Sequence, residues 1–282
     1  MEIKKFSDFC EQVLPDFNQF LNDRLNSEIK QETLKQAMLY SLNAGGKRVR
    51  PMLFLAVAYS SGVKLKDLPK YFDIAGAIEL VHTYSLIHDD LPEMDDSDYR
   101  RGKLSNHKKF GVGPAVLAGD GLLTQAFYWI AKSSLNTDKR MAAVRILSHN
   151  AGPMGMVAGQ MTDITMEDKV LSESELTTLH KEKTADLMMA AITMGAFCAD
   201  HELSKNLVLY AQDVGLAFQL KDDLDDCSDG EDADKNTFPN LIGKEATETK
   251  LNELVKEAFN AVLKEDKFDK NLLVSFLDYF KE

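Results

Sequence analysis

Cysteine is scarce in this chain of 282 residues, and its few copies are scattered. The three cysteines are Cys10, Cys198 and Cys227, and no two of them form a Cys-x-x-Cys pair. An odd, dispersed set of thiols is not typical of a disulfide framework or of a zinc site. The cysteine content therefore favours a protein of the reducing cytoplasm.

Long apolar runs are also absent. The longest apolar stretches, such as residues 52–59 and 187–192, are much shorter than the roughly 20 residues that a membrane-spanning helix needs. The N-terminal stretch MEIKKFSDFCEQVL mixes charges of both signs and has no uninterrupted apolar core, so it does not resemble a signal peptide. We therefore expect a soluble protein that is not embedded in a membrane.

Positive charge is in deficit. The chain has 33 Lys and Arg residues against 45 Asp and Glu residues, which gives a formal net charge of -12. An acidic surface repels nucleic acid and anionic lipid, so we expect neither as a partner. A polyanionic ligand would need a site that clustered basic side chains or bound metal ions create locally.

Proline and glycine are sparse, with 7 and 16 residues, and most of them stand where a helix could begin or end. Between them, apolar residues recur at spacings of three and four, and alternating strand patterns are hard to find. Two examples of such helical strips are Ile74, Ile78, Val81, Ser85 and His88, and then Leu207, Tyr210, Val214, Ala217 and Lys221. The pattern predicts one all-α domain over residues 1–282 with about ten helices, one of which begins with a capping box at Ser172.

Two acidic clusters interrupt the apolar pattern. They are HDDLPEMDD at residues 88–96 and QLKDDLDD at residues 219–226, and each follows a long apolar helical stretch. Acidic runs are usually solvated surface, but like charges four apart on one helix face, such as Asp222 and Asp226, repel unless something neutralises them. Mg²⁺ takes one or two carboxylates and completes its shell with water and substrate phosphates. The clusters therefore predict a site for Mg²⁺ and a phosphate-bearing ligand.

Basic residues accompany both acidic clusters. The segment GGKRVRP at residues 45–51 places Lys47 and Arg50 at the entrance of an apolar helix. Its glycines permit a tight turn, and proline suits the first helical position. Helix entrances bind anions readily. The other basic candidates are Arg100, Arg101, Lys183 and Lys235.

Taken together, these motifs resemble those of the trans-prenyl diphosphate synthases, and in particular the bacterial farnesyl diphosphate synthases. The resemblance covers the segments GGKRVRP (45–51), HTYSLIHDDLPEMDDSDYRRGK (82–103), GVGPAVLAGDGLLTQAF (111–127), GMVAGQMTDI (155–164), HKEKTADLM (180–188) and FQLKDDLDD (218–226). It implies the isoprenoid synthase fold, which is an orthogonal helix bundle around a central cavity, and a homodimer. The implied reaction joins isopentenyl diphosphate head to tail to dimethylallyl or geranyl diphosphate and gives a C15 product.

The resemblance also implies a role for each motif residue. The Mg²⁺ ligands, for about three ions per diphosphate, would be Asp89, Asp95 and Asp222, with Asp90, Asp223 and Asp226 in support. The allylic diphosphate would be held by Arg100, Lys183 and Lys235. The diphosphate of isopentenyl diphosphate would be held by Gly46, Lys47, Arg50, His82 and Arg101. The developing carbocation would be stabilised by the dipoles of Thr184 and Gln219.

Four alternatives differ from this interpretation. A geranylgeranyl diphosphate (C20) synthase would share every motif and differ in product length. A class I terpene cyclase typically replaces one aspartate motif, and a non-catalytic subunit tends to lose one, whereas this chain has both. A helical scaffold with acidic surface clusters would not explain why basic and acidic motifs alternate along the chain.

The resemblance implies that product length depends on Tyr84 and its neighbour Ser85, because in the family a residue five before the first aspartate helps to form the floor of the pocket for the growing chain. Tyr84 stands five residues before Asp89, which on a helix is about 7.5 Å below it, so a bulky ring there would stop the growing chain. We expect Tyr84→Ala to lengthen the product beyond C15. Chromatography of the hydrolysed products measures this, and an unchanged distribution would show that Tyr84 is only a core aromatic.

Overall fold

The computed structural model describes residues 3–166, 169–229 and 236–281, and their regular secondary structure is almost entirely helical. The chain divides into two compact units. Unit 1 consists of Met1–Phe9, Ala56–Val63 and Arg145–Glu282, and unit 2 consists of Cys10–Leu55 and Lys64–Val144. The all-α fold class is confirmed, whereas a single domain over residues 1–282 stays a prediction.

Three helices contribute residues to both units, and they are α1 (Phe6–Glu28), α3 (Val49–Ser60) and α7 (Thr137–Ala151). Unit 2 also contains α2 (Glu32–Leu42), η1 (Leu65–Tyr71), α4 (Phe72–Asp89), β1 (Tyr99–Arg100), β2 (Lys103–Leu104), α5 (Asn106–Phe110) and α6 (Val112–Lys132). Unit 1 also contains α8 (Met156–Thr165), α9 (Glu173–His180), η2 (Lys181–Ala185), α10 (Asp186–Cys198), α11 (Lys205–Asp229), α12 (Phe238–Ile242), α13 (Lys244–Leu263), α14 (Asn271–Phe276) and η3 (Leu277–Phe280).

The described residues form fourteen α-helices, which is more than the predicted ten. The excess comes from short helices such as α5 and α12, because five residues are too few to show an apolar period. The hairpin of β1 and β2 was not predicted either, since strands of two residues show no alternation. The capping box at Ser172 is confirmed, with the Ser172 side chain accepting from the Glu175 amide and the Glu175 carboxylate accepting from the Ser172 amide.

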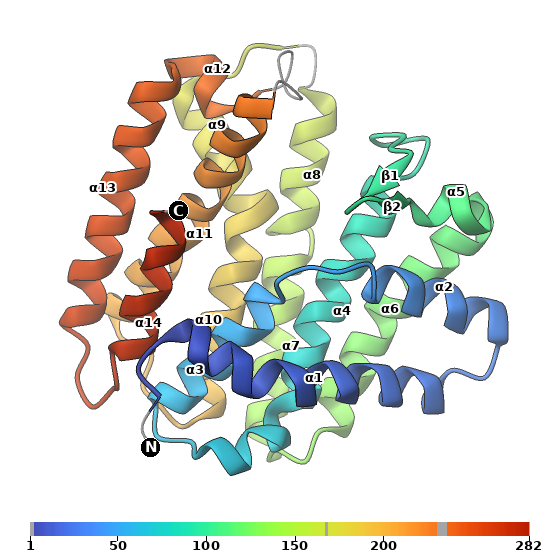
Figure 1. Ribbon diagram of the computed structural model, residues 1–282, viewed down its shortest axis with the longest axis horizontal. Coiled ribbons are helices and arrows are strands. Elements are labelled where there is room, and N and C mark those ends of the chain that lie inside the picture. Colours follow the sequence, from blue (N-terminus) through green and yellow to red (C-terminus); the bar gives the residue numbers. More distant parts are fainter. Residues whose placement is uncertain (1–2, 167–168, 230–235, 282) are drawn as a thin grey trace. The chain divides into compact units, whose positions relative to one another are not determined.

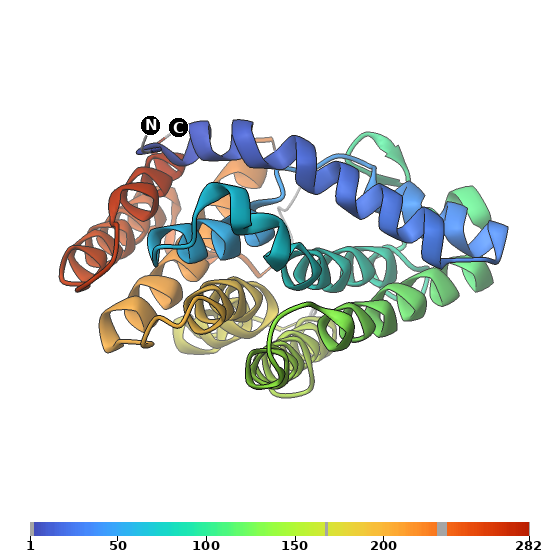
Figure 2. The same ribbon diagram turned by 90° about the horizontal axis from the view of Figure 1, so that it is seen from below.

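Helix α4 forms the centre of unit 2. Apolar residues lie on all of its faces, as is typical of a helix that is covered on every side. It runs beside α6, and the two views agree on this pairing (Figures 1 and 2). Its last residues carry the first acidic cluster, so the packing of α4 fixes where that cluster lies.

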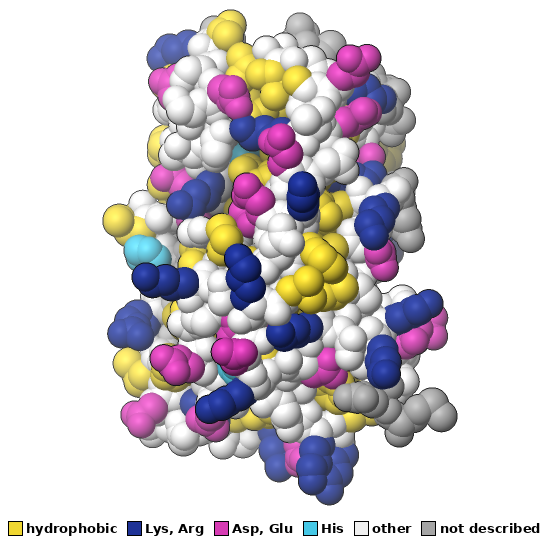
Figure 3. Space-filling view, turned by 90° about the vertical axis from the view of Figure 1, so that its left-hand side faces the viewer, with side chains coloured by type: hydrophobic (Ala, Val, Ile, Leu, Met, Phe, Trp, Pro, Cys, Tyr) yellow, Lys and Arg dark blue, Asp and Glu magenta, His cyan; other side chains and the backbone are white. Residues whose placement is uncertain are grey.

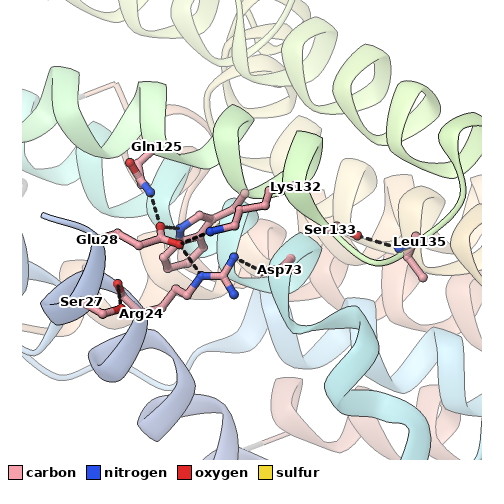
Figure 4. Close-up of polar contacts among 9 residues, drawn as sticks. Arg24, Ser27, Glu28, Asp73, Gln125, Lys132, Ser133 and Leu135 are labelled. Atoms are coloured by element: carbon pink, nitrogen blue, oxygen red, sulfur yellow. Dashed lines mark hydrogen bonds and ion pairs between the residues drawn. The ribbon is translucent and has the colours of Figure 1, made fainter.

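A four-donor contact at Glu28 fastens the end of α1 to α6 within unit 2 (Figure 4). One carboxylate oxygen accepts from Gln125 Nε2 at 2.6 Å and Trp129 Nε1 at 2.8 Å, and the other accepts from Arg24 Nε at 2.7 Å and Lys132 Nζ at 3.2 Å. Burial alone would raise the pKa of Glu28, but these hydrogen bonds outweigh it and lower the pKa. The ionised carboxylate therefore links α1 to α6 at neutral pH.

Helix α11 is the corresponding element of unit 1, where it packs against α13 and α10. Its buried Tyr210 donates a hydrogen bond from the phenol to the Leu273 carbonyl at 2.8 Å, which ties α11 to α14. The face that includes α13 has basic and acidic side chains interspersed with small apolar areas (Figure 3). Among the described residues, none of the helices combines the length and hydrophobicity that crossing a bilayer would take. The cytoplasmic location stays a prediction.

Candidate active site

The first acidic cluster lies at the carboxyl end of α4, in unit 2. Asp89 is the last helical residue and Asp90 is the C-cap. The chain then folds back, because the Asp95 amide donates to the Asp89 carbonyl at 2.9 Å and the Asp96 amide donates to the Leu91 carbonyl at 3.0 Å. The loop thus returns Asp95 to the helix end beside Asp89. Carboxylates at this end of a helix face the negative pole of its dipole, which favours bound cations.

Asp90 is turned inward and is bound by Arg100. It is 2% exposed, and its Oδ1 atom accepts from both Nε (2.9 Å) and Nη2 (2.5 Å) of Arg100. Burial lowers the pKa of the Arg100 guanidinium, but the hydrogen bond and the charge of Asp90 outweigh this and raise the pKa. Arg100 is therefore a permanent cation beside the Asp89–Asp95 loop.

The hairpin of β1 and β2 places Arg100 and Arg101. Tyr99 pairs with Leu104 and Arg100 pairs with Lys103, so the two-residue turn is Arg101-Gly102. Both turn residues have positive φ, 53° and 73°, as the tight hairpin turn requires. Arg101 donates to the Gly45 carbonyl, and Lys103 Nζ donates to the Asn43 carbonyl at 3.2 Å. The hairpin is thus fastened to the basic turn at residues 45–51.

Arg48 holds the basic turn in place through buried contacts. This side chain is 7% exposed, donates from Nη1 to Glu79 at 2.6 Å and also donates to the Leu42 carbonyl. Glu79 is 2% exposed and lies in the middle of α4. The backbone at Arg48 has a φ of 51°, a strained value that only a well-held residue keeps. The buried ion pair therefore anchors the turn to α4.

The predicted anion ligands surround this turn. Lys47 is exposed, and Arg50 is half-buried with its Nη1 atom 3.5 Å from His82 Nε2. Burial and then the charges of Arg50 and Arg101 lower the pKa of His82 well below its usual value, so the ring is neutral. Because Arg50 can only donate, His82 Nε2 is the acceptor.

Gly46 has a steric role that the sequence did not indicate. A Cβ atom at this position would lie 2.5 Å from Nη1 of Arg101. The φ of Gly46 is 113°, a conformation that favours glycine, and the missing side chain lets the guanidinium lie against the turn. All five residues that were predicted to hold the diphosphate of isopentenyl diphosphate, at positions 46, 47, 50, 82 and 101, belong to unit 2.

Tyr84 and Ser85 lie on α4, before the acidic cluster. Tyr84 is 7% exposed, and its ring makes an edge contact with His88 at a centroid distance of 5.7 Å. Burial raises the pKa of its phenol. Ser85 is half-buried and donates to the His82 carbonyl at 2.9 Å. The structure places both residues on the helix that leads to Asp89, and their predicted role in product length stays a prediction.

The second acidic cluster lies in the last three turns of α11, in unit 1. Asp222 is half-buried, Asp223 is buried and Asp226 is exposed. Asp225 forms a local ion pair with Lys221, with Nζ–O distances of 2.6 and 2.8 Å. Asp222 and Asp226 are one turn apart on the same helix face, so their charges repel and a bound cation would stabilise both.

Lys183 and Thr184 lie on the π-helical turn η2. Such turns often occur at functional sites. Gly159 of α8 packs directly against this turn, where a Cβ atom would lie 2.3 Å from the Lys183 amide nitrogen. Lys183 binds Asp163 of α8, and Thr184 donates from Oγ1 to Gln219 Oε1 at 2.6 Å. The structure thus brings Thr184 and Gln219 together, as their shared predicted role requires, while Lys235 lies outside the described residues.

The residues fit Mg²⁺ by their chemistry. Within the part of the chain that the structure describes, no three Asp, Glu, His or Cys side chains form a cluster able to hold a metal ion. Mg²⁺ needs no closed protein cage, since one or two carboxylates suffice when phosphate oxygens and water complete its shell. The oxygens of Asp89, Asp95 and Asp222 are donors of the required hard kind.

Sequence reasoning missed three residues that position the site: Arg48, Glu79 and Asp163. Glu79 offered a signal, since a lone carboxylate within the apolar stretch of 74–81 must find a partner. Arg48 stands inside the basic motif, but nothing in the pattern separates a buried arginine from its exposed neighbours. Asp163 gave no signal in the sequence.

Comparisons with known proteins agree on one family. The family model of polyprenyl synthetase matches residues 31–273. Farnesyl diphosphate synthase of Micrococcus luteus is 42% identical over 263 residues, which cover 88% of this chain and 89% of that protein. Geranylgeranyl pyrophosphate synthase 11 of Arabidopsis thaliana is 40% identical over 268 residues, which cover 88% of this chain and 74% of that protein.

A solved structure is similar over the whole length. It is geranyltransferase from Helicobacter pylori complexed with magnesium and isoprenyl diphosphate, with a TM-score of 0.87 and 33% identity over 100% of this chain and 99% of that chain. At 33% identity this likeness supports relationship as well as fold. The chain spans most of the length of each of these proteins.

Removing the charge of Arg48 tests the anchoring of the basic turn. Arg48→Met would leave Glu79 as an uncompensated buried carboxylate, and we expect it to lower the free energy of unfolding by about 3–5 kcal/mol. The neighbouring Lys47→Met is the matched control, since an exposed side chain should change stability by less than about 0.5 kcal/mol. Urea unfolding measures both, and equal losses in the two variants would contradict the anchoring role.

Proposed function

The chain belongs to the polyprenyl synthetase family, and from this membership we propose that it joins isopentenyl diphosphate head to tail to dimethylallyl and geranyl diphosphate, with farnesyl diphosphate (C15) as its product. The observation that carries the proposal is the similarity of nearly the whole chain to farnesyl diphosphate synthases. The enzyme is thus a prenyltransferase of isoprenoid biosynthesis.

Isopentenyl diphosphate is bound by the basic turn and its neighbours. Lys47 and Arg101 are exposed at the turn, and Arg50 is aligned by neutral His82. Arginine grips phosphate oxygens with paired N–H donors, whereas lysine acts as a point charge. The contact of Arg101 with the turn at Gly45 and Gly46 supports a single site for these groups.

The family resemblance implies that Arg100, Lys183 and Lys235 would hold the allylic diphosphate and that Asp89, Asp95 and Asp222 would hold Mg²⁺. When bound, Mg²⁺ supplies positive charge that neutralises the diphosphate as its C–O bond breaks. The resemblance implies about three ions with the diphosphate bound. Arg100 presents a fixed cation, because Asp90 holds it by two hydrogen bonds. Lys183 contacts Asp163 in the structure, so it exchanges or shares that partner when it binds the diphosphate.

The allylic cation that forms is stabilised by oxygen atoms of Thr184 and Gln219. These two side chains are in mutual contact, and their dipoles favour the cation only when oxygen lone pairs face it. The double bond of isopentenyl diphosphate attacks the cation, and a proton is then lost to the released diphosphate. Water must be excluded during these steps because it would quench the cation.

The C15 product is supported by the buried ring of Tyr84 on the helix that leads to Asp89. A ring at this position limits the length of the growing chain by steric contact. The similarity to geranylgeranyl pyrophosphate synthases keeps the C20 product as the second candidate. The two differ only in the chain length that is released.

The partner surface for a second copy of the chain is α6. Its Leu117 is 62% exposed and its Tyr128 is 50% exposed, and both lie on one helix face with the exposed Thr124 between them. Large apolar side chains that gather on an exposed face mark contacts with other proteins. This face supports the homodimer that the family resemblance implies.

A direct assay tests the proposed reaction. Purified protein with isopentenyl diphosphate, geranyl diphosphate and Mg²⁺ should release a C15 diphosphate, and chelation of Mg²⁺ should abolish the product. Asp89→Ala should lower kcat/KM by about 10²–10³-fold, because a carboxylate that holds the metal is lost. The exposed Asp98, which is paired with Lys108, provides the control Asp98→Ala, which should keep nearly full activity. Release of no product from the wild type would reject the proposal.

The dimer proposal predicts that the α6 face holds two copies together. Sedimentation velocity should show a dimer for the wild type, and Leu117→Glu should convert it to a monomer by placing a charge in the apolar contact. Leu209→Glu on α11, where the leucine is 42% exposed, is the control that should stay dimeric. A monomeric wild type, or a Leu117→Glu variant that stays dimeric, would contradict the assignment.

A further inference from the structure

Asp223 differs from the other aspartates of the second cluster in its surroundings. Its side chain is 3% exposed, whereas Asp222 before it is half-buried. Its Oδ1 atom accepts from Gln219 Nε2 at 2.8 Å, and its Oδ2 atom accepts from the Phe238 amide at 3.1 Å. Both carboxylate oxygens are therefore engaged by donors of the protein itself.

These bonds belong to a chain of hydrogen bonds within unit 1 that runs from Asp223 through Gln219 to Thr184, here called the relay. Gln219 donates to Asp223 through its amide nitrogen and accepts from Thr184 through its amide oxygen. A carboxylate only accepts, so it determines which way the Gln219 amide faces. With the NH₂ end bound to Asp223, the oxygen end must face Thr184. The Thr184 hydroxyl then points its proton at Gln219 and keeps its oxygen lone pairs directed elsewhere.

This orientation has a consequence for the chemistry of the proposed function. A developing carbocation is stabilised by the negative ends of nearby dipoles, and it is destabilised by amide or hydroxyl hydrogens. Fixed dipoles are worth more than mobile ones, because no reorganisation is needed when charge develops. The group that fixes the Gln219 amide therefore decides whether the pair helps or opposes ionisation.

We propose that Asp223 is a positioning residue, which holds the oxygen ends of Gln219 and Thr184 toward the allylic cation, and that it is not a Mg²⁺ ligand. The proposal rests on the prenyl transfer proposed above and reassigns a residue that the sequence motif suggested as a metal ligand. Asp222, its half-buried neighbour, keeps the metal role.

The second oxygen of Asp223 secures the relay from the other side. It accepts the amide hydrogen of Phe238, the first residue of α12. The Phe238 ring makes an edge contact with the buried His180 at a centroid distance of 5.4 Å, and His180 Nδ1 is 3.7 Å from Asp223. The carboxylate is thus enclosed between α9, α11 and α12, which suits an orienting group and hinders entry of a hydrated ion.

Asp223→Asn tests the relay with little change in shape. If the asparagine oxygen accepts from the Phe238 amide, its NH₂ group faces the NH₂ group of Gln219. Gln219 must then turn over, and its hydrogens point at Thr184 and at the cation. We expect kcat to fall by about 10- to 100-fold, with KM for geranyl diphosphate changed by less than about threefold.

A compensating change should restore the pattern of donors and acceptors. In the double variant Gln219→Glu with Asp223→Asn, the asparagine NH₂ donates to the new glutamate and its oxygen still accepts from Phe238. The glutamate's other oxygen accepts from Thr184, so oxygen again faces the cation. We expect the double variant to recover most of the lost kcat and the thermal midpoint, whereas Gln219→Glu alone should be impaired by two adjacent carboxylates.

A second measurement separates positioning from metal binding without an assay of activity. Mg²⁺ with inorganic diphosphate should raise the thermal midpoint of the wild type, because a ligand that binds the folded state stabilises it. Asp223→Asn should keep this shift, and Asp222→Asn should reduce it. Circular dichroism first establishes that each variant is folded, and the double variant carries the test if the single variant is not.

Two results would overturn the proposal. One is an Asp223→Asn variant that loses the Mg²⁺-diphosphate shift and regains full activity only at high Mg²⁺, as a metal ligand would. The other is a folded double variant with no recovery of kcat over Asp223→Asn. A wild type that releases no prenyl product would instead reject the proposed function, and the two failures are thus distinguishable.

Discussion

The structure of the site depends on one electrostatic constraint: carboxylates gather at the carboxyl ends of helices in a chain whose net charge is already -12. Such groups repel one another and face the negative pole of the helix dipole, so each needs a positive or hydrogen-bonding partner. In unit 2 that partner is Arg100, which the β1–β2 hairpin delivers to Asp90. The hairpin in turn lies on the basic turn, and Arg48 anchors that turn to α4 through Glu79. One acidic cluster thus accounts for a chain of contacts that ends back on the helix carrying it.

In both units a buried aspartate of the acidic cluster is held by hydrogen-bond donors, but the donors differ. The first acidic residues of each cluster are two consecutive aspartates, and the second of each pair is turned inward. Asp90 is 2% exposed and bound by a guanidinium, whereas Asp223 is 3% exposed and bound by an amide side chain and a backbone amide. Consecutive helical residues are about 100° apart around the axis, since a turn holds 3.6 residues. One aspartate of a pair can therefore face a ligand while its neighbour organises the protein around it.

The sequence predicted the elements whose signals are long or local. The apolar periods of α4 and α11 and the capping box of α9 were evident, because each repeats a pattern or uses a specific residue pair. The motifs also identified the members of the Thr184–Gln219 contact. The Arg48–Glu79 ion pair and the π-turn at Lys183 could not be predicted, because each depends on a partner far away in the chain. The hairpin pairs near neighbours, but its two-residue strands are too short to show an alternating pattern. A motif shows which residues belong to a site. Only the burial of each side chain in the structure distinguishes the residues that face a ligand from those that support the surrounding backbone.

The backbone is strained at three residues within or beside the sequence motifs. Arg48, Asp96 and Arg101 have φ values of 51°, 43° and 53°, a region that residues other than glycine rarely adopt. Each costs free energy unless its surroundings hold it, and here the holding contacts are the Glu79 ion pair, the Leu91 carbonyl and the Gly45 carbonyl. Loops fixed in this way need little reordering when a diphosphate binds, so more of the binding energy remains for the transition state. The same argument explains why the Arg48–Glu79 pair is buried: a solvent-exposed ion pair, at about 0–1 kcal/mol, would be too weak to hold the strained backbone at Arg48.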